Sequence, residues 1–566
     1  MTIPANGNHG NGEERAYVYR DVPMGTKRNI KIITIGGGAS GINMAFQLKT
    51  HMTDYTHVAY ERNTELGGTW LENRYPGCAC DIPSHSYQFS WAPYTKWPSF
   101  YSKSEDIYEY MNWCVDTHDL RGDFKVGYEV VGAKWDEDTA EWVVSVRGPD
   151  GVVFDDRADF LVNGNGVLNK WKWPSIDGLH DFKGHLVHSA KWDQTYDFKD
   201  KTIAVIGVGS TAVQIIPSLQ PIVGNMKCFI RSPAWITPSY GAQFAGPNGS
   251  NFNYTDEQKA KFEESPEEYL AYRKAIEDSL NARFKIMQKA SDEQKAARAA
   301  CTAEMATKLA SKPELRELLI PDFAVGCRRP TPGNGFLEAL VSDNVDVVST
   351  RIERVTPNGI MTADGVEHVV DAIVCATGFD VSLKPRFPFV GRNGADLAER
   401  WSKGPAESYM SIMVDNHPNY FTYLGPSAPV AHGSVLPIIE VMSLYMLKVM
   451  NKMQVEPIRS IAPTEQAVKE FNIHRNEQLK TTVWSSKCSS WFKGGTIDGD
   501  LIALHPGSRI HFIQMVENPR YEDMEIQYDG NRYSYLGNGV TMREVRGEDL
   551  SWYLNNPLDV TLPYPK

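Results

Sequence analysis

The sequence predicts an α/β protein with two Rossmann-like dinucleotide-binding domains, the second of which carries a helical insertion. Two stretches, 30–41 and 202–212, each consist of a buried β-branched strand, a glycine-rich turn and the start of a helix, the order found in nucleotide-binding α/β folds. The segment between Gly249 and Gly326 contains no glycine and is rich in Ala, Glu, Lys and Arg. Such a composition is typical of helices with solvated faces.

The length of 566 residues exceeds what one hydrophobic core supports, so two or three domains are expected. We expect the first domain to be split in the sequence, so that the chain leaves it, builds the second domain and returns. The predicted segments are a loose N-terminal arm (1–28), the first domain (29–170), an interdomain linker (171–193), the second domain (194–235), the helical insertion (236–322), the rest of the second domain (323–385), and the rest of the first domain with substrate and cofactor loops (386–566).

Composition excludes several classes of protein. The net charge of −12 argues against a nucleic-acid partner, and no stretch reaches the roughly 18 apolar residues of a membrane span. The polar N-terminus carries no secretory signal, so a cytoplasmic location is expected.

The eight cysteines show no regular spacing, which favours free thiols in a reducing compartment over a disulfide framework. Cys78 and Cys80 are too closely spaced for a zinc site and lack a second pair. No metal site is therefore predicted.

The first nucleotide site is predicted at the turn that contains Gly36, Gly38, Ser40 and Gly41. Glycines allow the backbone to approach a pyrophosphate at a helix N-terminus. Twenty residues after Gly41, Glu61 ends the next strand, where a carboxylate accepts hydrogen bonds from ribose hydroxyls. This site is assigned to FAD.

The second nucleotide site follows the strand 202–206 and comprises Gly207, Val208, Gly209, Ser210, Thr211 and Ala212. Alanine in the third glycine position is compatible with the contact between helix and strand. Arg231 occupies the position where an acid would bind the ribose hydroxyls, and a guanidinium there favours a 2′-phosphate. The second site is therefore predicted to prefer NADPH to NADH.

Two further segments carry a family resemblance. Gly67–Asp81 reads GGTWLENRYPGCACD, and Phe182–Asp193 reads FKGHLVHSAKWD. Together they resemble the paired signatures of Baeyer–Villiger monooxygenases, and the resemblance covers most of the chain. It implies FAD and NADPH as cofactors and dioxygen and a ketone as substrates. It also implies a C4a-peroxyflavin as the oxidising species and an ester or lactone as the product.

The resemblance assigns the catalytic cation to Arg329 and its partner to Asp81. The segment Cys327-Arg328-Arg329 resembles the family's Cys-Lys-Arg element, with arginine in place of lysine at 328, which leaves open which arginine faces the flavin. A fixed positive charge would stabilise the peroxide and the oxyanion of the following adduct. The same resemblance places Gly68, Thr69, Trp70, Tyr87 and Val130 at FAD, Asp81 also among the FAD contacts, and Ala79, Cys80, Ser232, Cys327, Arg328 and Trp491 at NADPH.

In the second signature, His188 is interpreted as part of a hydrogen-bonded hinge with Gly184 and Trp192, because this chemistry needs no general base. The loop 426–435 is expected to line the substrate pocket, with Val435 at its apolar wall.

Three alternatives stay open at this stage. The first is a related flavin monooxygenase that oxygenates nitrogen or sulfur centres. The second, a pyridine nucleotide–disulfide reductase, is disfavoured because Cys78-Ala79-Cys80 lacks the spacing of a redox Cys-x-x-Cys pair. The third is a non-enzymatic flavin-binding sensor. The sequence indicates neither the particular ketone nor the oligomeric state.

Overall fold

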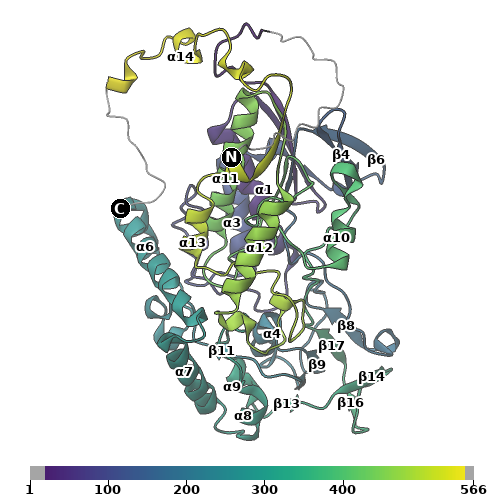
Figure 1. Ribbon diagram of the computed structural model, residues 1–566. Coiled ribbons are helices and arrows are strands. Elements are labelled where there is room, and N and C mark those ends of the chain that lie inside the picture. Colours follow the sequence, from purple (N-terminus) through teal and green to yellow (C-terminus); the bar gives the residue numbers. More distant parts are fainter. Residues whose placement is uncertain (1–18, 555–566) are drawn as a thin grey trace, which may run out of the picture.

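The computed structural model describes residues 19–554 and contains two parallel sheets, one above the other in the view of Figure 1. The predicted fold class is confirmed. The first sheet has the strand order β19-β7-β1-β2-β3, and all its neighbouring strands are parallel. Its strands are β1 (Ile30–Ile35), β2 (Tyr55–Glu61), β3 (Phe124–Val126), β7 (Phe160–Asn163) and β19 (Tyr420–Thr422).

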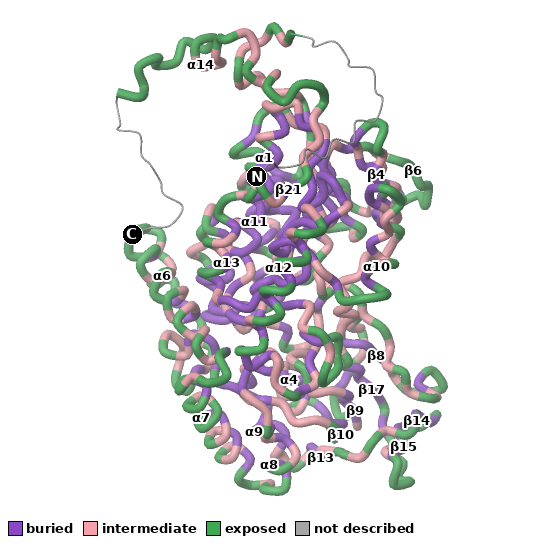
Figure 2. The backbone as a smooth tube through the Cα atoms, in the orientation of Figure 1, coloured by how far each residue is buried: buried purple, intermediate pink, exposed green. Residues whose placement is uncertain are grey.

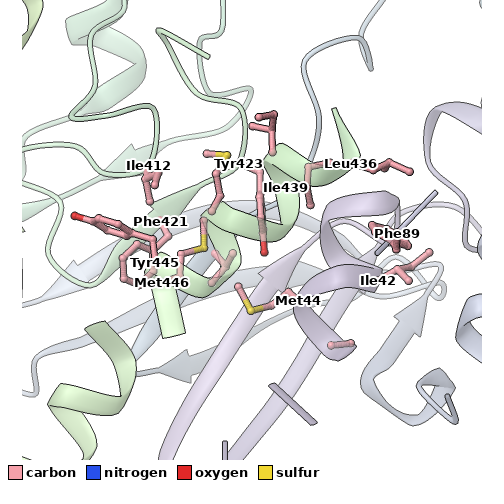
Figure 3. Close-up of a cluster of buried hydrophobic side chains, with 14 of the residues drawn as sticks. Ile42, Met44, Phe89, Ile412, Phe421, Tyr423, Leu436, Ile439, Tyr445 and Met446 are labelled. Atoms are coloured by element: carbon pink, nitrogen blue, oxygen red, sulfur yellow. The ribbon is translucent and has the colours of Figure 1, made fainter. Parts of the chain in front are cut away.

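Helix α1 (Ala39–His51) follows β1 directly and packs against the long helix α11 (Leu436–Val455), although almost 400 residues separate them in the chain. Figure 3 shows side chains of this interface, with Met44 from α1 and Ile439 from α11 in the centre and Ile42 beside Phe89. A hydrogen bond of 2.7 Å from Asn43 Nδ2 to Ser443 Oγ joins the two helices inside the apolar layer. The first domain is therefore completed by the C-terminal part of the chain.

The second sheet has the order β13-β10-β9-β17-β8 and is also fully parallel. It comprises β8 (His185–His188), β9 (Thr202–Ile206), β10 (Asn225–Phe229), β13 (Val345–Val348) and β17 (Ala372–Cys375), with helices α4 (Ser210–Leu219) and α9 (Phe336–Leu340) packed on it. The segment predicted as an interdomain linker thus contributes an edge strand to this sheet, because its residues 185–188 pair with β17.

The stretch after Gly249 is helical, as its glycine-free composition predicts, and α6 and α7 run along one side of the molecule in Figure 1. Its helices are α5 (Asp256–Glu264), α6 (Pro266–Ala282), α7 (Asp292–Lys308) and α8 (Glu314–Leu319). The short strands β11 (Ile236–Thr237) and β12 (Thr331–Pro332) pair in parallel at the two ends of the insertion. This pairing returns the chain to the second domain beside the point where it left.

The remaining elements form smaller layers around the two sheets. The buried positions, coloured purple in Figure 2, concentrate in the centre of each domain. The smaller elements are α2 (Thr69–Glu72), α3 (Ser104–Thr117), β4 (Glu129–Asp136), β5 (Glu141–Arg147), β6 (Val153–Ala158), β14 (Ile352–Thr356), β15 (Gly359–Thr362), β16 (Glu367–Val369), β18 (Phe389–Val390), α10 (Leu397–Lys403), β20 (Ile458–Pro463), α12 (Glu465–Leu479), α13 (Arg509–Met515), β21 (Met524–Tyr528) and α14 (Met542–Val545).

Most of the predicted N-terminal arm, residues 1–18, lies outside the described residues. The part that is described, 19–28, is tied to the rest of the chain. Met24 pairs with the C-terminal segment at Val540 and Met542 through backbone hydrogen bonds, and Arg28 donates to the carbonyls of Met453 and Ile458. Among residues 19–554, no helix is long and apolar enough to cross a membrane.

Candidate active site

A cleft of about 690 Å³ lies at the carboxyl ends of the second sheet. The turn after β9, the residues after β10 and the residues after β13 all line it, which is where open α/β sheets bind nucleotides. Of the residues predicted to contact NADPH, those that line the cleft are Gly207, Val208, Gly209, Ser210, Arg231, Ser232, Arg328 and Trp491. The structure therefore gathers into one cavity residues that span almost 300 positions of the sequence.

The other predicted NADPH residues do not line this cleft. Thr211 and Ala212 continue into α4, where Ala212 is buried in the core. Ala79 contacts the same helix, since its carbonyl accepts a hydrogen bond of 2.9 Å from Gln214 Nε2. Cys80 and Cys327 are buried nearby in the fold's interior.

The glycine at position 207 is required by its surroundings. Its φ is +128°, and a Cβ placed on it would lie 2.5 Å from the carbonyl oxygen of Ala376. By contrast, a Cβ on Gly209 would meet no atom within 4 Å. The first glycine thus forms the tight turn, and the backbone at the second borders open space where a pyrophosphate can approach.

The cleft is strongly cationic. Four arginines line it, Arg231, Arg328, Arg329 and Arg351, and no carboxylate is found among the described residues of its lining. Arg328 donates to the carbonyl oxygen of Pro233 at 3.1 Å, while its buried Nε has no partner among the residues that the structure describes. Burial lowers the pKa of the Arg328 guanidinium. An unpaired buried donor of this kind is suited to an anionic ligand.

Arg351 and its neighbour Thr350 are lining residues that the sequence reasoning missed. Strand β13 lies beside β10 with Val348 opposite Phe229, and Ile230 N continues the ladder to the Val348 carbonyl at 3.0 Å. Continuing this register places Thr350 beside Arg231 at the sheet edge. The signal was absent from the sequence because nothing in it shows which strand lies next to β10.

At the first fingerprint, Gly36 has φ +104°, and a Cβ there would lie 2.7 Å from the carbonyl oxygen of Gly164. The buried carboxylate of Glu61 accepts hydrogen bonds from Gly37 N at 2.7 Å and Asn63 N at 2.8 Å. Burial raises the pKa of Glu61, although these two N–H groups oppose the shift. The acid predicted from the spacing therefore does lie against the glycine turn, next to Gly38, Ser40 and Gly41 at the start of α1.

Arg329 and Asp81 form the ion pair that the resemblance implies. The pair is bidentate, with Nη1–Oδ2 and Nη2–Oδ1 distances of 2.6 and 2.9 Å. Burial lowers the pKa of Arg329, but the charge and hydrogen bonds of Asp81 outweigh that effect and the net pKa is raised. Its side chain keeps 30% of its surface exposed and lines the cleft. Arg329 is therefore a permanently charged group held in one orientation at the edge of the cavity.

Aromatic groups of the first domain lie close to this ion pair. Trp70 Nε1 donates to Tyr87 OH at 3.2 Å, and their rings meet edge to face. Thr69 begins the short helix α2 directly after Gly68. Val130 is buried in β4 within the core cluster that contains Ile35 and Tyr60, and Val435 lies at the start of α11 against the core cluster that contains Tyr87.

The first signature connects the two domains. Tyr75 OH donates to Gln214 Oε1 at 2.8 Å, and Gln214 Nε2 donates to the Ala79 carbonyl. Gln214 belongs to α4, the helix that starts at the second fingerprint. The segment between Gly67 and Asp81 therefore positions its aspartate beside Arg329 while it touches the nucleotide helix of the other domain.

His188 ends β8 and is almost fully buried. Its Nδ1 accepts a hydrogen bond from Ala190 N at 3.1 Å, its Nε2 lies 3.2 Å from Thr377 Oγ1, and its ring stacks on Trp171. Burial lowers the pKa of His188 to about 4, so the ring is neutral at pH 7. A neutral, hydrogen-bonded ring is consistent with a positioning role. Close by, Gly184 packs against the Asp371 carbonyl, and Trp192 stacks on Phe198.

One prediction about the cysteines is wrong. Cys327 and Cys488 form a disulfide, whereas Cys78, Cys80, Cys114, Cys228, Cys301 and Cys375 are free thiols. The bonded pair is 161 residues apart in sequence, so no local spacing could reveal it, and only the fold brings their Cα atoms to 6.4 Å. Among residues 19–554, no group of three or more potential metal ligands is placed to hold a metal ion.

Comparisons with known proteins agree with this geometry. Residues 34–104 match the family model of the NAD(P)-binding Rossmann-like domain. The chain is 40% identical to the FAD-binding monooxygenase moxY of Dothistroma septosporum, over 94% of this chain and 86% of that protein. It is 33% identical to a Baeyer–Villiger monooxygenase of Streptomyces coelicolor, over 86% of this chain and 90% of that protein.

Among solved structures, cyclohexanone monooxygenase from Rhodococcus sp. Phi1 bound to NADP⁺ superposes with a TM-score of 0.76 at 27% identity, covering 89% of this chain and all of that one. The fold and the site together define a flavoprotein monooxygenase with two dinucleotide-binding domains. Within that class, the chain belongs to the Baeyer–Villiger monooxygenase family.

Proposed function

We propose that this protein inserts one oxygen atom of dioxygen next to the carbonyl of a ketone and forms an ester or lactone, with NADPH as electron donor. The overall reaction converts ketone, O₂, NADPH and a proton to ester, NADP⁺ and water. The observation that carries the proposal is the bidentate Arg329–Asp81 pair at the edge of a cationic dinucleotide cleft. A cytoplasmic location remains the prediction from the sequence.

The residues of the two fingerprints fit the two cofactors. The turn from Gly36 to Gly41 with Glu61 would hold the pyrophosphate and ribose of FAD. The second turn would hold the pyrophosphate of NADPH, and Arg231, Ser232 and the unpaired Nε of Arg328 would bind its 2′-phosphate. When bound and reduced, the flavin supplies electrons that activate dioxygen.

The role of Arg329 follows from charge. Oxygen insertion requires an anionic oxidant and passes through negative charge on the former carbonyl oxygen, and a fixed cation at low dielectric stabilises both. Asp81 holds both Nη atoms of the guanidinium and so fixes its direction. His188 is neutral and lies in β8, outside the lining of the cleft. We therefore assign it to positioning of the second domain.

The test is a ketone panel assayed with the purified flavoprotein. We expect NADPH oxidation to depend on ketone and to yield ester in proportion. The same panel includes an organic sulfide and a tertiary amine. Oxygenation of these two without any ester would instead support the related monooxygenases of soft centres, and NADPH oxidation that gives only hydrogen peroxide with every compound would overturn the proposal.

A further inference from the structure

The disulfide between Cys327 and Cys488 joins two segments that line the cofactor cleft. Cys327 immediately precedes Arg328 and Arg329, and Cys488 immediately precedes the loop 489–495 that contains Trp491. Residues from both segments contact the same cavity. The bond therefore ties the catalytic arginine segment to the loop expected at the nicotinamide cofactor.

Apart from the disulfide, the loop 489–495 is held largely by hydrogen bonds among its own residues and to the residues directly before and after it. Lys493 Nζ donates to the carbonyls of Ser486 and Ile497 at 2.7 and 2.8 Å, and Gly495 N donates to the Ser490 carbonyl at 2.9 Å. Phe492 anchors it by packing into a small core cluster with Trp484 and Leu504. These contacts preserve the shape of the loop, whereas the disulfide fixes its distance from Arg328 and Arg329.

We propose that Cys327 and Cys488 are a reversible thiol–disulfide switch that controls how tightly the Trp491 loop closes on the bound nicotinamide cofactor. In the disulfide form the loop is held next to the arginines. In the dithiol form it is free to move away on the anchor of Phe492, because ordering a loop has an entropic cost that the covalent bond removes in advance. The inference rests on the proposed function, since it assumes that NADPH occupies this cleft.

The chemistry of the switch balances with one oxidant. A Cys thiolate attacks hydrogen peroxide, the O–O bond breaks, and a sulfenic acid and hydroxide form; the second thiol then attacks that sulfur and water leaves. Two thiols and one H₂O₂ give one disulfide and two H₂O. Hydrogen peroxide is released by a flavin monooxygenase whenever activated oxygen is not transferred, and a dithiol reductant reverses the bond by exchange.

The experiment compares the two redox states of the intact flavoprotein. Peptide mapping after alkylation gives the state of the cysteines, and titration of the flavin spectrum with NADP⁺ gives its dissociation constant. We expect reduction by a dithiol to raise this constant by about three- to tenfold, one equivalent of hydrogen peroxide to restore it, and flavin content to stay the same.

Two variants separate this pair from the other thiols. Cys488→Ala should show the weaker binding of the reduced enzyme and no response to dithiol or peroxide. Cys301→Ala, which removes a buried free thiol in α7, should respond like the parent enzyme. If Cys488→Ala does not fold, the comparison of the reduced and oxidised parent enzyme still decides.

The inference is overturned if no peptide containing the Cys327–Cys488 bond forms under peroxide, or if both states bind NADP⁺ equally. Failure of the proposed function would look different. The disulfide would still form and break, but the protein would neither bind NADP⁺ nor convert any ketone.

Discussion

At the scale of single residues, the candidate site contains one partly exposed charge, that of Arg329, which is paired on one side only. Asp81 binds both Nη atoms of Arg329, which leaves the charge of the guanidinium available toward the cleft. The family resemblance predicts both residues for the site and leaves open whether Arg328 or Arg329 faces the flavin. In the structure Arg328 bonds to Pro233 and packs on Phe323, while Arg329 pairs with Asp81, and the placement of Arg329 at the flavin stays a prediction.

We expect Arg329→Ala to retain FAD and accept hydride from NADPH but to form no ester. Without the fixed cation, electrons pass to oxygen and leave as hydrogen peroxide. Parallel assays of NADPH, peroxide and ester measure this. The control is the double variant Arg329→Ala with Asp81→Asn. The second substitution removes the carboxylate that Arg329→Ala leaves unpaired, so the double variant should recover stability but not ester formation. Asp81→Ala alone should keep some turnover. Ester formation near the parent rate in Arg329→Ala would rule out this role, and Arg328 would be tested next.

We expect Arg231→Ala to weaken NADPH binding by about 1.5–3 kcal/mol and to leave NADH binding nearly unchanged, because only NADPH carries the 2′-phosphate. Arg351→Ala should act in the same direction, since Arg351 lines the same end of the cleft. Arg354→Ala removes an equally exposed arginine that does not line the cleft and serves as the matched control. Titrations with NADP⁺ and NAD⁺ measure both. Equal losses for the two cofactors would contradict the phosphate assignment.

At the scale of elements, local sequence patterns correctly predicted the strands, turns and helices that depend mainly on neighbouring residues. Strand, glycine turn and helix follow each other within about a dozen residues at both fingerprints, and the composition of the insertion alone favours helix. Pairing across long sequence distances could not be predicted. The position of β13 next to β10, which brings Arg351 to the cleft, the addition of 185–188 to a sheet, and the Cys327–Cys488 bond all depend on which distant segments meet.

His188 at the end of β8 should make the stability of the protein depend on pH. The folded pKa of about 4 lies below the ordinary value of 6.5, so between these values the unfolded chain binds a proton that the folded chain does not. Stability from this group is therefore full above pH 6.5 and is lost as pH falls toward 4, by about 1–3 kcal/mol. His188→Gln should be less stable at pH 7, and its deficit should shrink as pH falls to 4.5, as measured by thermal unfolding.

His188→Gln also tests the interpretation of His188 as part of a hinge between the domains. His188→Gln should bind FAD and be reduced by NADPH, while oxygen insertion is impaired because the second domain is less well positioned. Loss of flavin on purification would place His188 at the first nucleotide site instead. A stability deficit independent of pH would show that the ring is not held neutral in the folded protein.

At the scale of the whole molecule, two nucleotide domains must hold FAD and NADPH close together, and polar contacts of the first signature are among those that join the domains. Gln214 in α4 bonds to Tyr75 and to the carbonyl of Ala79 in the first signature. This one side chain thus connects the helix at the NADPH turn to the segment that ends at Asp81. We infer that it sets the position of the Arg329–Asp81 pair relative to the cleft.

We expect Gln214→Leu to keep both domains folded and FAD bound, because Gln214 lies at their junction and outside both predicted nucleotide turns. It removes two hydrogen bonds worth about 1 kcal/mol each and leaves the half-buried Tyr75 hydroxyl without its acceptor. Hydride transfer from NADPH should slow, and the amount of peroxide should rise relative to ester, because the variant loses hydrogen bonds that align the two domains. Stopped-flow reduction of the flavin and the ratio of ester to NADPH consumed measure these effects. The control is Gln220→Leu: Gln220 directly follows α4 and bonds to Asn344 within the same domain. This variant should lose similar stability but still couple NADPH oxidation to ester formation. A rise in peroxide in both variants would show that loosening of the second domain, and not its position relative to Asp81, causes the uncoupling.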